Sequence, residues 1–336
     1  MYVLTAVVLG SVIPSIALAQ PARVRTLTYD ADKKDWVELP PPPPGTPEGD
    51  LHLIRIHIKD GHFREALKVT ERFDKRHGSA HELYPAVLLA KAQALIGRRD
   101  YDKAHGVLQA FLGEYAGIAQ TPEALRLEFV IAEAYLGGAK RKLWGLAILS
   151  GEDVALRILD EISTDYPDGK EAEWAVKTKA DYLFRTGQHG LAEDEYARLI
   201  RDFPRSQYYR YAWRRAADAS LASFGGVEFD EAALIEAQER FREYQGRFPS
   251  DAGQEDVQAI LDRIHQLRGE KEYSIADYYE RTDHLTSAVF HYRLVRKDYP
   301  ETIAARRAAA RLEALGAVEP EDSGLPSSTG DTENGS

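Results

Sequence analysis

Ten histidines and a large number of carboxylates are the side chains best suited to metal or acid–base chemistry. His77 and His81 stand four residues apart, a spacing that suits two metal ligands on a helix, but Gly78 and Ser79 between them indicate a loop. The carboxylates are spread along the chain, so no pair stands out as acid and base. Cysteine, a glycine-rich phosphate loop and the HExxH and GxSxG motifs do not occur. The sequence therefore predicts no catalysis, no metal site and no cofactor.

Lys177, Asp181 and Arg185 recur every four residues, so they share one stripe along a helix. Such a stripe can hold a bound peptide by charge-assisted hydrogen bonds. The same spacing equally suits a surface on which neighbouring charges pair only with each other. Both interpretations stay open, and we treat the three residues as candidate peptide contacts.

The run from Gly137 to Gly145 holds the densest basic patch in a chain whose net charge is −11. Its glycines predict a loop. Lys140, Arg141 and Trp144 would then be available to contact a partner or a lipid headgroup. In the alternative interpretation the loop is solvated, and Trp144 packs under the neighbouring helices.

Tyr208 and Tyr209 begin an aromatic cluster that continues with Tyr211 and Trp213. Aromatic side chains often anchor protein interfaces, so Tyr208 and Tyr209 are candidate partner contacts. The alternative is that the cluster packs between helices.

The bulk composition is that of a globular protein, with 44% hydrophobic and 29% charged residues. Because 54 acidic residues outnumber 43 basic ones, the chain is poorly suited to binding polyanions. We therefore expect other proteins as partners, and neither nucleic acid nor a small-molecule substrate.

The N-terminus has the features of a secretion signal. Residues Tyr2 to Ala19 carry no charge and are mostly apolar, and Ala17 and Ala19 supply the small side chains that signal peptidase needs. We expect a signal peptide at 1–19, with a membrane anchor at the N-terminus as the alternative.

Three further segments follow the signal. Five consecutive prolines, Pro40–Pro44, favour polyproline II, so residues 20–49 are predicted to be a disordered, proline-rich spacer. Residues 50–316 have helical periodicity and are predicted to form a helical-repeat domain. Residues 317–336 are rich in Ser, Gly and acidic residues and are predicted to be a disordered acidic tail.

Internal repetition is the strongest pattern in the sequence. Four times, an alanine is followed twelve residues later by a proline that comes directly after an aromatic residue. The four pairs are Ala155 and Pro167, Ala192 and Pro204, Ala237 and Pro249, and Ala288 and Pro300. Two earlier units, around Ala66 and Ala104, keep only the first half of the pattern.

This spacing suits pairs of antiparallel helices. A small alanine lets two helices cross closely, large residues four and seven positions later fill the gap to the next pair, and the proline ends the second helix. One pair cannot bury its apolar face alone, so the pairs stack. The pattern resembles the tetratricopeptide repeat and is most complete between Trp174 and Pro204. We therefore expect an all-α fold, a tetratricopeptide-type α-solenoid of five to six helical hairpins.

The repeats resemble more narrowly the outer-membrane β-barrel assembly lipoproteins of the BamD type. The residues that carry this resemblance are the helix from Glu272 to Tyr279, Ala288, and the segment from Asp298 to Thr302. The long segment between Leu143 and Asp153, which separates two helices of one hairpin, adds to it. The sequence departs from the family in having no cysteine that an acyl chain could modify.

The resemblance implies a non-enzymatic scaffold in the periplasm that helps to assemble outer-membrane proteins. The N-terminal hairpins would bind unfolded outer-membrane proteins, and the C-terminal hairpins would dock subunits of the assembly machine. Through these partners the chain would associate with the outer membrane. The alternative is a more general periplasmic tetratricopeptide adaptor in envelope integrity or cell division.

Overall fold

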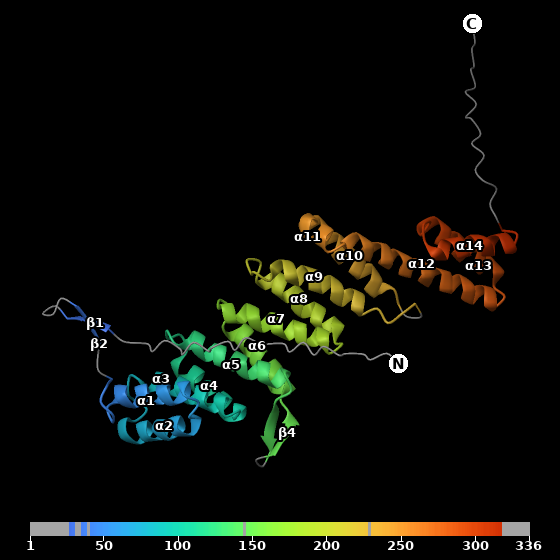
Figure 1. Ribbon diagram of the computed structural model, residues 1–336. Helices are drawn as coiled ribbons and strands as arrows, with labels where there is room; N and C mark the ends of the chain where they lie inside the picture. Colours follow the sequence, from blue (N-terminus) through green and yellow to red (C-terminus); the bar gives the residue numbers. More distant parts are fainter. Residues whose placement is uncertain (1–26, 31–34, 39–40, 144–145, 228–229, 318–336) are drawn as a thin grey trace, which may run out of the picture. The chain divides into compact units, whose positions relative to one another are not determined.

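The computed structural model describes residues 27–30, 35–38, 41–143, 146–227 and 230–317 (Figure 1). The predicted signal peptide at 1–19, Trp144, and all but the first residue of the predicted acidic tail lie outside these residues. The chain divides into two compact units, Met1–Val87 and Leu88–Ser336, which we describe separately. No helix in the described ranges is both long and apolar enough to span a membrane.

The first unit contains a pair of short strands and a helical hairpin. β1 (Leu27–Asp30) pairs antiparallel with β2 (Asp35–Glu38), and α1 (Pro47–Lys59) packs against α2 (Phe63–His77). The core of the hairpin consists of fully buried side chains from both helices, among them Ile54, Ala66 and Phe73.

This unit differs from the sequence prediction in two ways. β1 and β2 both lie within residues 20–49, for which a disordered spacer was predicted, and α1 begins at Pro47, before the predicted start of the helical domain. Pro47 suits the first position of a helix, where no backbone N–H is needed for a hydrogen bond. The Thr46 side chain also caps this helix by accepting a hydrogen bond from the Gly49 N–H at 3.1 Å. The predicted boundary was too late because the proline run just before these residues was taken to extend the spacer to residue 49.

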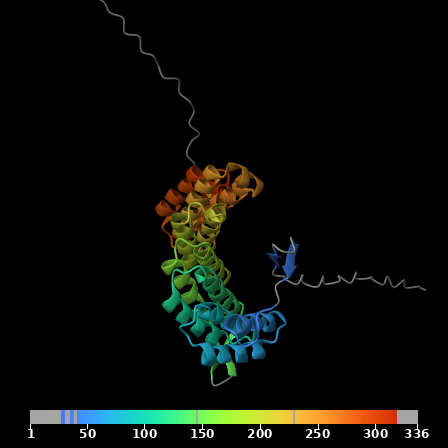
Figure 2. The ribbon, with the colours of Figure 1, turned by 90° about the vertical axis from the view of Figure 1, so that its left-hand side faces the viewer.

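The second unit is a succession of antiparallel helices in which, from Tyr101 onward, each long helix packs on the next in chain order (Figure 1). The same order is visible in the turned view of Figure 2. α3 (Tyr84–Gly97) contains the boundary between the two units. The helices that follow it are α4 (Tyr101–Tyr115), α5 (Thr121–Leu136), α6 (Glu152–Asp165), α7 (Lys170–Arg185), α8 (His189–Asp202), α9 (Tyr209–Ala222), α10 (Ala232–Arg247), α11 (Pro249–Gln254), α12 (Val257–Arg281), α13 (Leu285–Asp298) and α14 (Ile303–Ala314).

The repeat pattern coincides with six pairs of consecutive helices. The first pair is α1 and α2 in the first unit, and the others are α3–α4, α5–α6, α7–α8, α9–α10 and α12–α13. The expected all-α, tetratricopeptide-type α-solenoid of five to six helical hairpins is therefore confirmed.

Every repeat alanine lies on the second helix of its pair and is fully buried. The six residues are Ala66, Ala104, Ala155, Ala192, Ala237 and Ala288. The residues four and seven positions later are buried as well, for example Tyr196 and Leu199 after Ala192. The alanines thus mark the places where two helices cross too closely for a larger side chain.

The repeat prolines end the second helices, as predicted. α6, α8, α10 and α13 each stop one residue before the aromatic residue that precedes the proline. These four aromatic residues share nearly the same backbone conformation, with φ between −126° and −133° and ψ between 51° and 60° (Tyr166, Phe203, Phe248 and Tyr299). This conformation lies outside the α region, which the following proline disfavours.

The turn inside four of the hairpins uses one residue with positive φ, placed five residues before the repeat alanine. Gly61 and Gly187 occupy this position with φ of 75° and 80°. Arg99 and Asp283 occupy it in two other hairpins with φ of 57° and 62°, which is a strained conformation for a side chain with a Cβ.

The segment from Gly137 to Gly145 is not the loop that its glycines predicted. β3 (Lys140–Leu143) pairs antiparallel with β4 (Leu146–Ser150), with a bulge between Arg141 and Lys142. The prediction was wrong because it weighted the glycines at the ends of the segment and not the strand-forming residues, such as Ile148, that follow. As expected, this insertion separates the two helices of one hairpin, α5 and α6.

Candidate polypeptide-binding sites

The charged stripe predicted on α7 belongs to a polar cluster between α7, α8 and α9. Nζ of Lys177 lies 2.7 Å from Oδ2 of Asp181. Oδ1 of Asp181 accepts hydrogen bonds from the hydroxyl groups of Tyr196 on α8, at 2.6 Å, and Tyr211 on α9, at 2.7 Å. One carboxylate on the first helix of the hairpin therefore joins three consecutive helices.

The two tyrosines are held as hydrogen-bond donors. Burial, followed by the Asp181 carboxylate, raises the pKa of Tyr196 far above its ordinary value and the pKa of Tyr211 to about 12. Both hydroxyl groups consequently stay protonated at physiological pH and donate to Asp181 throughout.

Lys177 also contacts two aromatic rings. Its Nζ lies 5.4 Å from the ring centroid of Tyr208 and 4.8 Å from that of Tyr211, within the range of cation–π attraction. The structure therefore brings Lys177, Asp181 and Tyr208 together, and their charges already pair within the chain. Peptide binding by these residues stays a prediction.

The other two candidates on these helices lie elsewhere. The Arg185 guanidinium stacks on the ring of Tyr182, 5.3 Å from its centroid. Tyr209 contacts Trp213 and Phe248, each at a centroid distance of 6.3 Å, and so belongs to the packing between α9 and α10. Tyr208 is the N-cap residue of α9 and Tyr209 is its first helical residue, and the two rings contact different neighbours.

A cavity of about 320 Å³ lies between α4, α5 and α6, where the sequence gave no indication of a site. It combines apolar walls with carboxylates. The apolar lining residues are Leu112, Leu125, Ile158, Ile162 and Tyr166, and the others are Gln109, Gly113, Glu128, Glu161 and Asp165.

Glu128 lines this cavity and is only 1% exposed. Nδ1 of His105 lies 2.9 and 2.8 Å from its two carboxylate oxygens, and Nε2 of Gln109 donates to it at 3.2 Å. Burial raises the pKa of Glu128, and the contacts with His105 and Gln109 only partly oppose this effect.

Two further carboxylates line this cavity, and Arg157 pairs with one of them, since its Nε lies 3.8 Å from Oε1 of Glu161. Glu161 and Asp165 are more accessible than Glu128, and Glu161 accepts a hydrogen bond from Gln109 at 3.2 Å. Several of the lining residues belong to the last turns of α4 and α6. At these helix ends, unpaired carbonyl groups add partial negative charge. Chemically, the arrangement suits a cationic side chain with an apolar stem.

We predict that Glu128→Gln stabilises the protein more at about pH 7 than at about pH 4. Because the folded-state pKa of Glu128 is raised, the carboxyl contributes stability below its unfolded value near 4.5, and this contribution is lost as the pH rises through the raised pKa. Glutamine has no such loss and keeps an acceptor for Gln109. Melting temperatures of both proteins across this pH range measure the effect.

The difference in melting temperature, variant minus wild type, should therefore grow with pH. Glu239→Gln, at an exposed position on α10, is the control and should show no such trend. A difference that stays constant or shrinks towards neutral pH would contradict the prediction.

The remaining candidates lie on the β3–β4 hairpin. Nε of Arg141 lies 2.8 Å from Oδ1 of Asp102 on α4, whereas Lys140 is exposed. Burial alone would raise the pKa of Asp102, but the hydrogen bonds from Arg141 and Tyr135 outweigh it, and the pKa is lowered. Arg141 is thus a structural contact between hairpin and helix.

Stacked antiparallel hairpins with a buried alanine at each crossing define this chain as an α-solenoid of the tetratricopeptide type. Its position within that class follows from a family model, described as YfiO: Outer membrane lipoprotein, which matches residues 150–321. The chain belongs to this family.

One solved structure that the chain is similar to is the C-terminal part of a TPR repeat-containing protein from Cytophaga hutchinsonii. The two are 11% identical, the match covers 77% of this chain and 98% of the other, and the TM-score is 0.23. No curated protein matches the sequence.

Proposed function

We propose that this chain is a non-enzymatic scaffold of the BamD type, which binds polypeptides in the periplasm during the assembly of outer-membrane proteins. The family match supports the proposal, because it covers the helices from α6 to α14 and the matching family is described as an outer membrane lipoprotein. The solenoid supports it as well, since stacked helical hairpins present extended surfaces suited to binding other chains.

The observation that carries the proposal is the cavity between α4, α5 and α6. Its volume of about 320 Å³ accommodates a side chain of a partner, and Leu125 and Ile158 offer apolar contact for the stem. Glu161 and Asp165 are placed to accept hydrogen bonds from a lysine or arginine at its end. The scaffold would thus hold a polypeptide segment by a basic anchor residue.

A binding titration tests this function. A labelled, urea-unfolded outer-membrane β-barrel protein is diluted into solutions of the chain, and fluorescence anisotropy gives the dissociation constant. We expect saturable binding that is about tenfold weaker for the double variant Glu161→Gln, Asp165→Asn, because charge-assisted hydrogen bonds are lost. The matched control is Glu239→Gln, Glu243→Gln, which removes two exposed carboxylates from α10.

Two results would contradict the proposal. The first is no saturable binding of the unfolded β-barrel protein by the wild-type chain. The second comes from affinity capture out of an envelope extract: enrichment of cell-wall or division proteins, with no barrel-assembly subunit, would favour the general periplasmic adaptor.

A further inference from the structure

The β3–β4 hairpin concentrates exposed apolar side chains on one small element. Leu146, Ile148 and Leu149 are 64%, 57% and 40% exposed. They are three of the eleven large apolar side chains that are exposed in the described part of the chain, and all three lie on β4. Isolated exposed apolar residues are ordinary on a protein surface, but a cluster marks an interaction site.

The hairpin is fixed to the solenoid by its basic strand. Arg141 pairs with Asp102, and Nζ of Lys142 pairs with Asp100 at the start of α4. The hydroxyl of Tyr135 on α5 donates to Asp102 at 3.0 Å, so the same carboxylate holds the hairpin and the end of α5. These contacts use the side chains of β3, and the apolar side chains of β4 remain exposed.

Basic residues also surround the hairpin. Six of them outnumber the four carboxylates Asp100, Asp102, Glu152 and Asp153 of the adjoining segments, although the whole chain has a net charge of −11. They come from the turn between α3 and α4, from α4 and from β3: Arg98, Arg99, Lys103, Lys140, Arg141 and Lys142.

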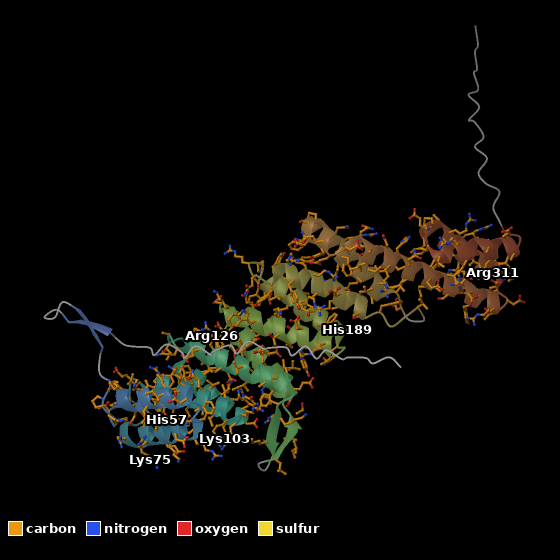
Figure 3. The ribbon with its side chains drawn as sticks, in the orientation of Figure 1. His57, Lys75, Lys103, Arg126, His189 and Arg311 are labelled. Atoms are coloured by element: carbon orange, nitrogen blue, oxygen red, sulfur yellow. The ribbon has the colours of Figure 1, made fainter. Side chains whose placement is uncertain are left out.

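Three of these cations are available for a ligand. Arg99, Lys103 and Lys140 are exposed, and none of them pairs with a carboxylate in the described ranges. Figure 3 labels Lys103 on α4, the helix that contacts β3. In the sequence Lys103 directly follows Asp102, which binds Arg141. The cationic side chains thus lie on β3 and on the adjoining turn and helix, and the apolar ones lie on the strand that pairs with β3.

We propose that this hairpin, with the adjoining turn between α3 and α4, binds the surface of an anionic lipid bilayer. Leu146 and Ile148 enter the boundary between headgroups and acyl chains, and Arg99, Lys103 and Lys140 contact lipid phosphates. Apolar residues flanked by basic ones are what peripheral proteins use for this purpose. The inference does not depend on the proposed scaffold function, which concerns a different surface.

A lipid surface suits this hairpin better as a ligand than a partner strand does. The outer edge of β3 carries lysines, and the bulge falls on β4, where Ile148 has no partner residue on β3. Both features oppose the addition of another strand. The excess of positive charge complements phosphate headgroups, whereas the remainder of this acidic chain would be repelled by them.

Co-sedimentation with vesicles tests the proposal on the full chain. One set of vesicles contains only phosphatidylcholine, and the other contains about one-third phosphatidylglycerol. We expect binding to the anionic vesicles only, and weaker binding at high salt. Lys103→Gln with Lys140→Gln should weaken binding about tenfold or more, since each cation near an anionic surface contributes about fivefold. Leu146→Ser with Ile148→Ser should weaken it by a similar factor.

Matched controls lie on other helices. Leu191→Ser with Phe290→Ser removes two apolar side chains of similar exposure, 55% and 58%, from α8 and α13. Arg296→Gln with Lys297→Gln removes two exposed cations from α13. Both control variants should bind the vesicles as the wild type does, and circular dichroism should show that all variants are folded.

Three outcomes would overturn the proposal. They are the absence of vesicle binding, equal binding to both kinds of vesicle, and unchanged binding of the two hairpin variants. If those variants instead lose a protein partner in affinity capture while vesicle binding stays the same, the hairpin is a protein-docking element and not a lipid contact.

Discussion

Replacing Tyr196 by alanine is expected to lower the free energy of unfolding by about 3–5 kcal/mol, because it removes a fully buried aromatic ring and leaves a cavity. The ring packs in the core between α7, α8 and α9, so its removal weakens the packing of all three helices. Urea unfolding followed by far-ultraviolet circular dichroism measures it.

The hydroxyl group of Tyr196 makes a separate contribution. Tyr196→Phe keeps the ring and removes only the donor to Asp181, so we expect a loss of about 1–2 kcal/mol. Asp181 retains Lys177 and Tyr211 as partners, which limits the damage.

An exposed tyrosine gives the control. Tyr278→Ala, at a position that is 57% exposed on α12, should change stability by less than about 0.5 kcal/mol. If Tyr196→Ala were no more destabilising than Tyr196→Phe, the ring would contribute nothing to the core and our account of the repeat would be wrong.

Enlarging a repeat alanine should also destabilise the fold. Ala192→Leu places three additional carbon atoms where α8 crosses its neighbours, against Val176 and Ala180 of α7. Overpacking of this kind costs about 1–3 kcal/mol, and the melting temperature should fall accordingly.

The same substitution at an exposed alanine separates packing from helix propensity. Ala110→Leu on α4 introduces the same side chain at an exposed position, so the melting temperature should stay close to that of the wild type. Equal effects at Ala110 and Ala192 would show that the crossing has room for leucine.

The recurrent spacing from alanine to proline was enough to predict the helical pairs and where their second helices end. The spacing works because each of its residues has one physical task. Ala192 permits a close crossing, Tyr196 and Leu199 fill the interface on the same face, and Pro204 prevents the helix from continuing. Such a pattern can be recognised in one amino-acid sequence, because its residues are close together along the chain.

The candidate sites were less predictable, because they join residues that are distant in sequence. Spacing alone placed Lys177 beside Asp181, but it gave no sign of the hydroxyl group of Tyr211, thirty residues further on. The cavity at Glu128 takes its lining from three helices, and His105 gives no sequence signal for the buried carboxylate that it contacts.

The hairpin was missed for a different reason. Glycine is common both in loops and at the ends of strands, so Gly137 and Gly145 did not separate the two possibilities. What fixes the strands on the solenoid is a pair of aspartates on another element, Asp100 and Asp102.

From α4 onward, each long helix packs on the one that follows it in the chain, and this has a consequence for how the protein folds. Contacts between near neighbours in sequence need only short loops to close, and such topologies reach the native state quickly. The hairpin of α5 and α6 has its packing partners within reach before α14 has been synthesised. This solenoid therefore suits folding in the order of its synthesis, one hairpin at a time.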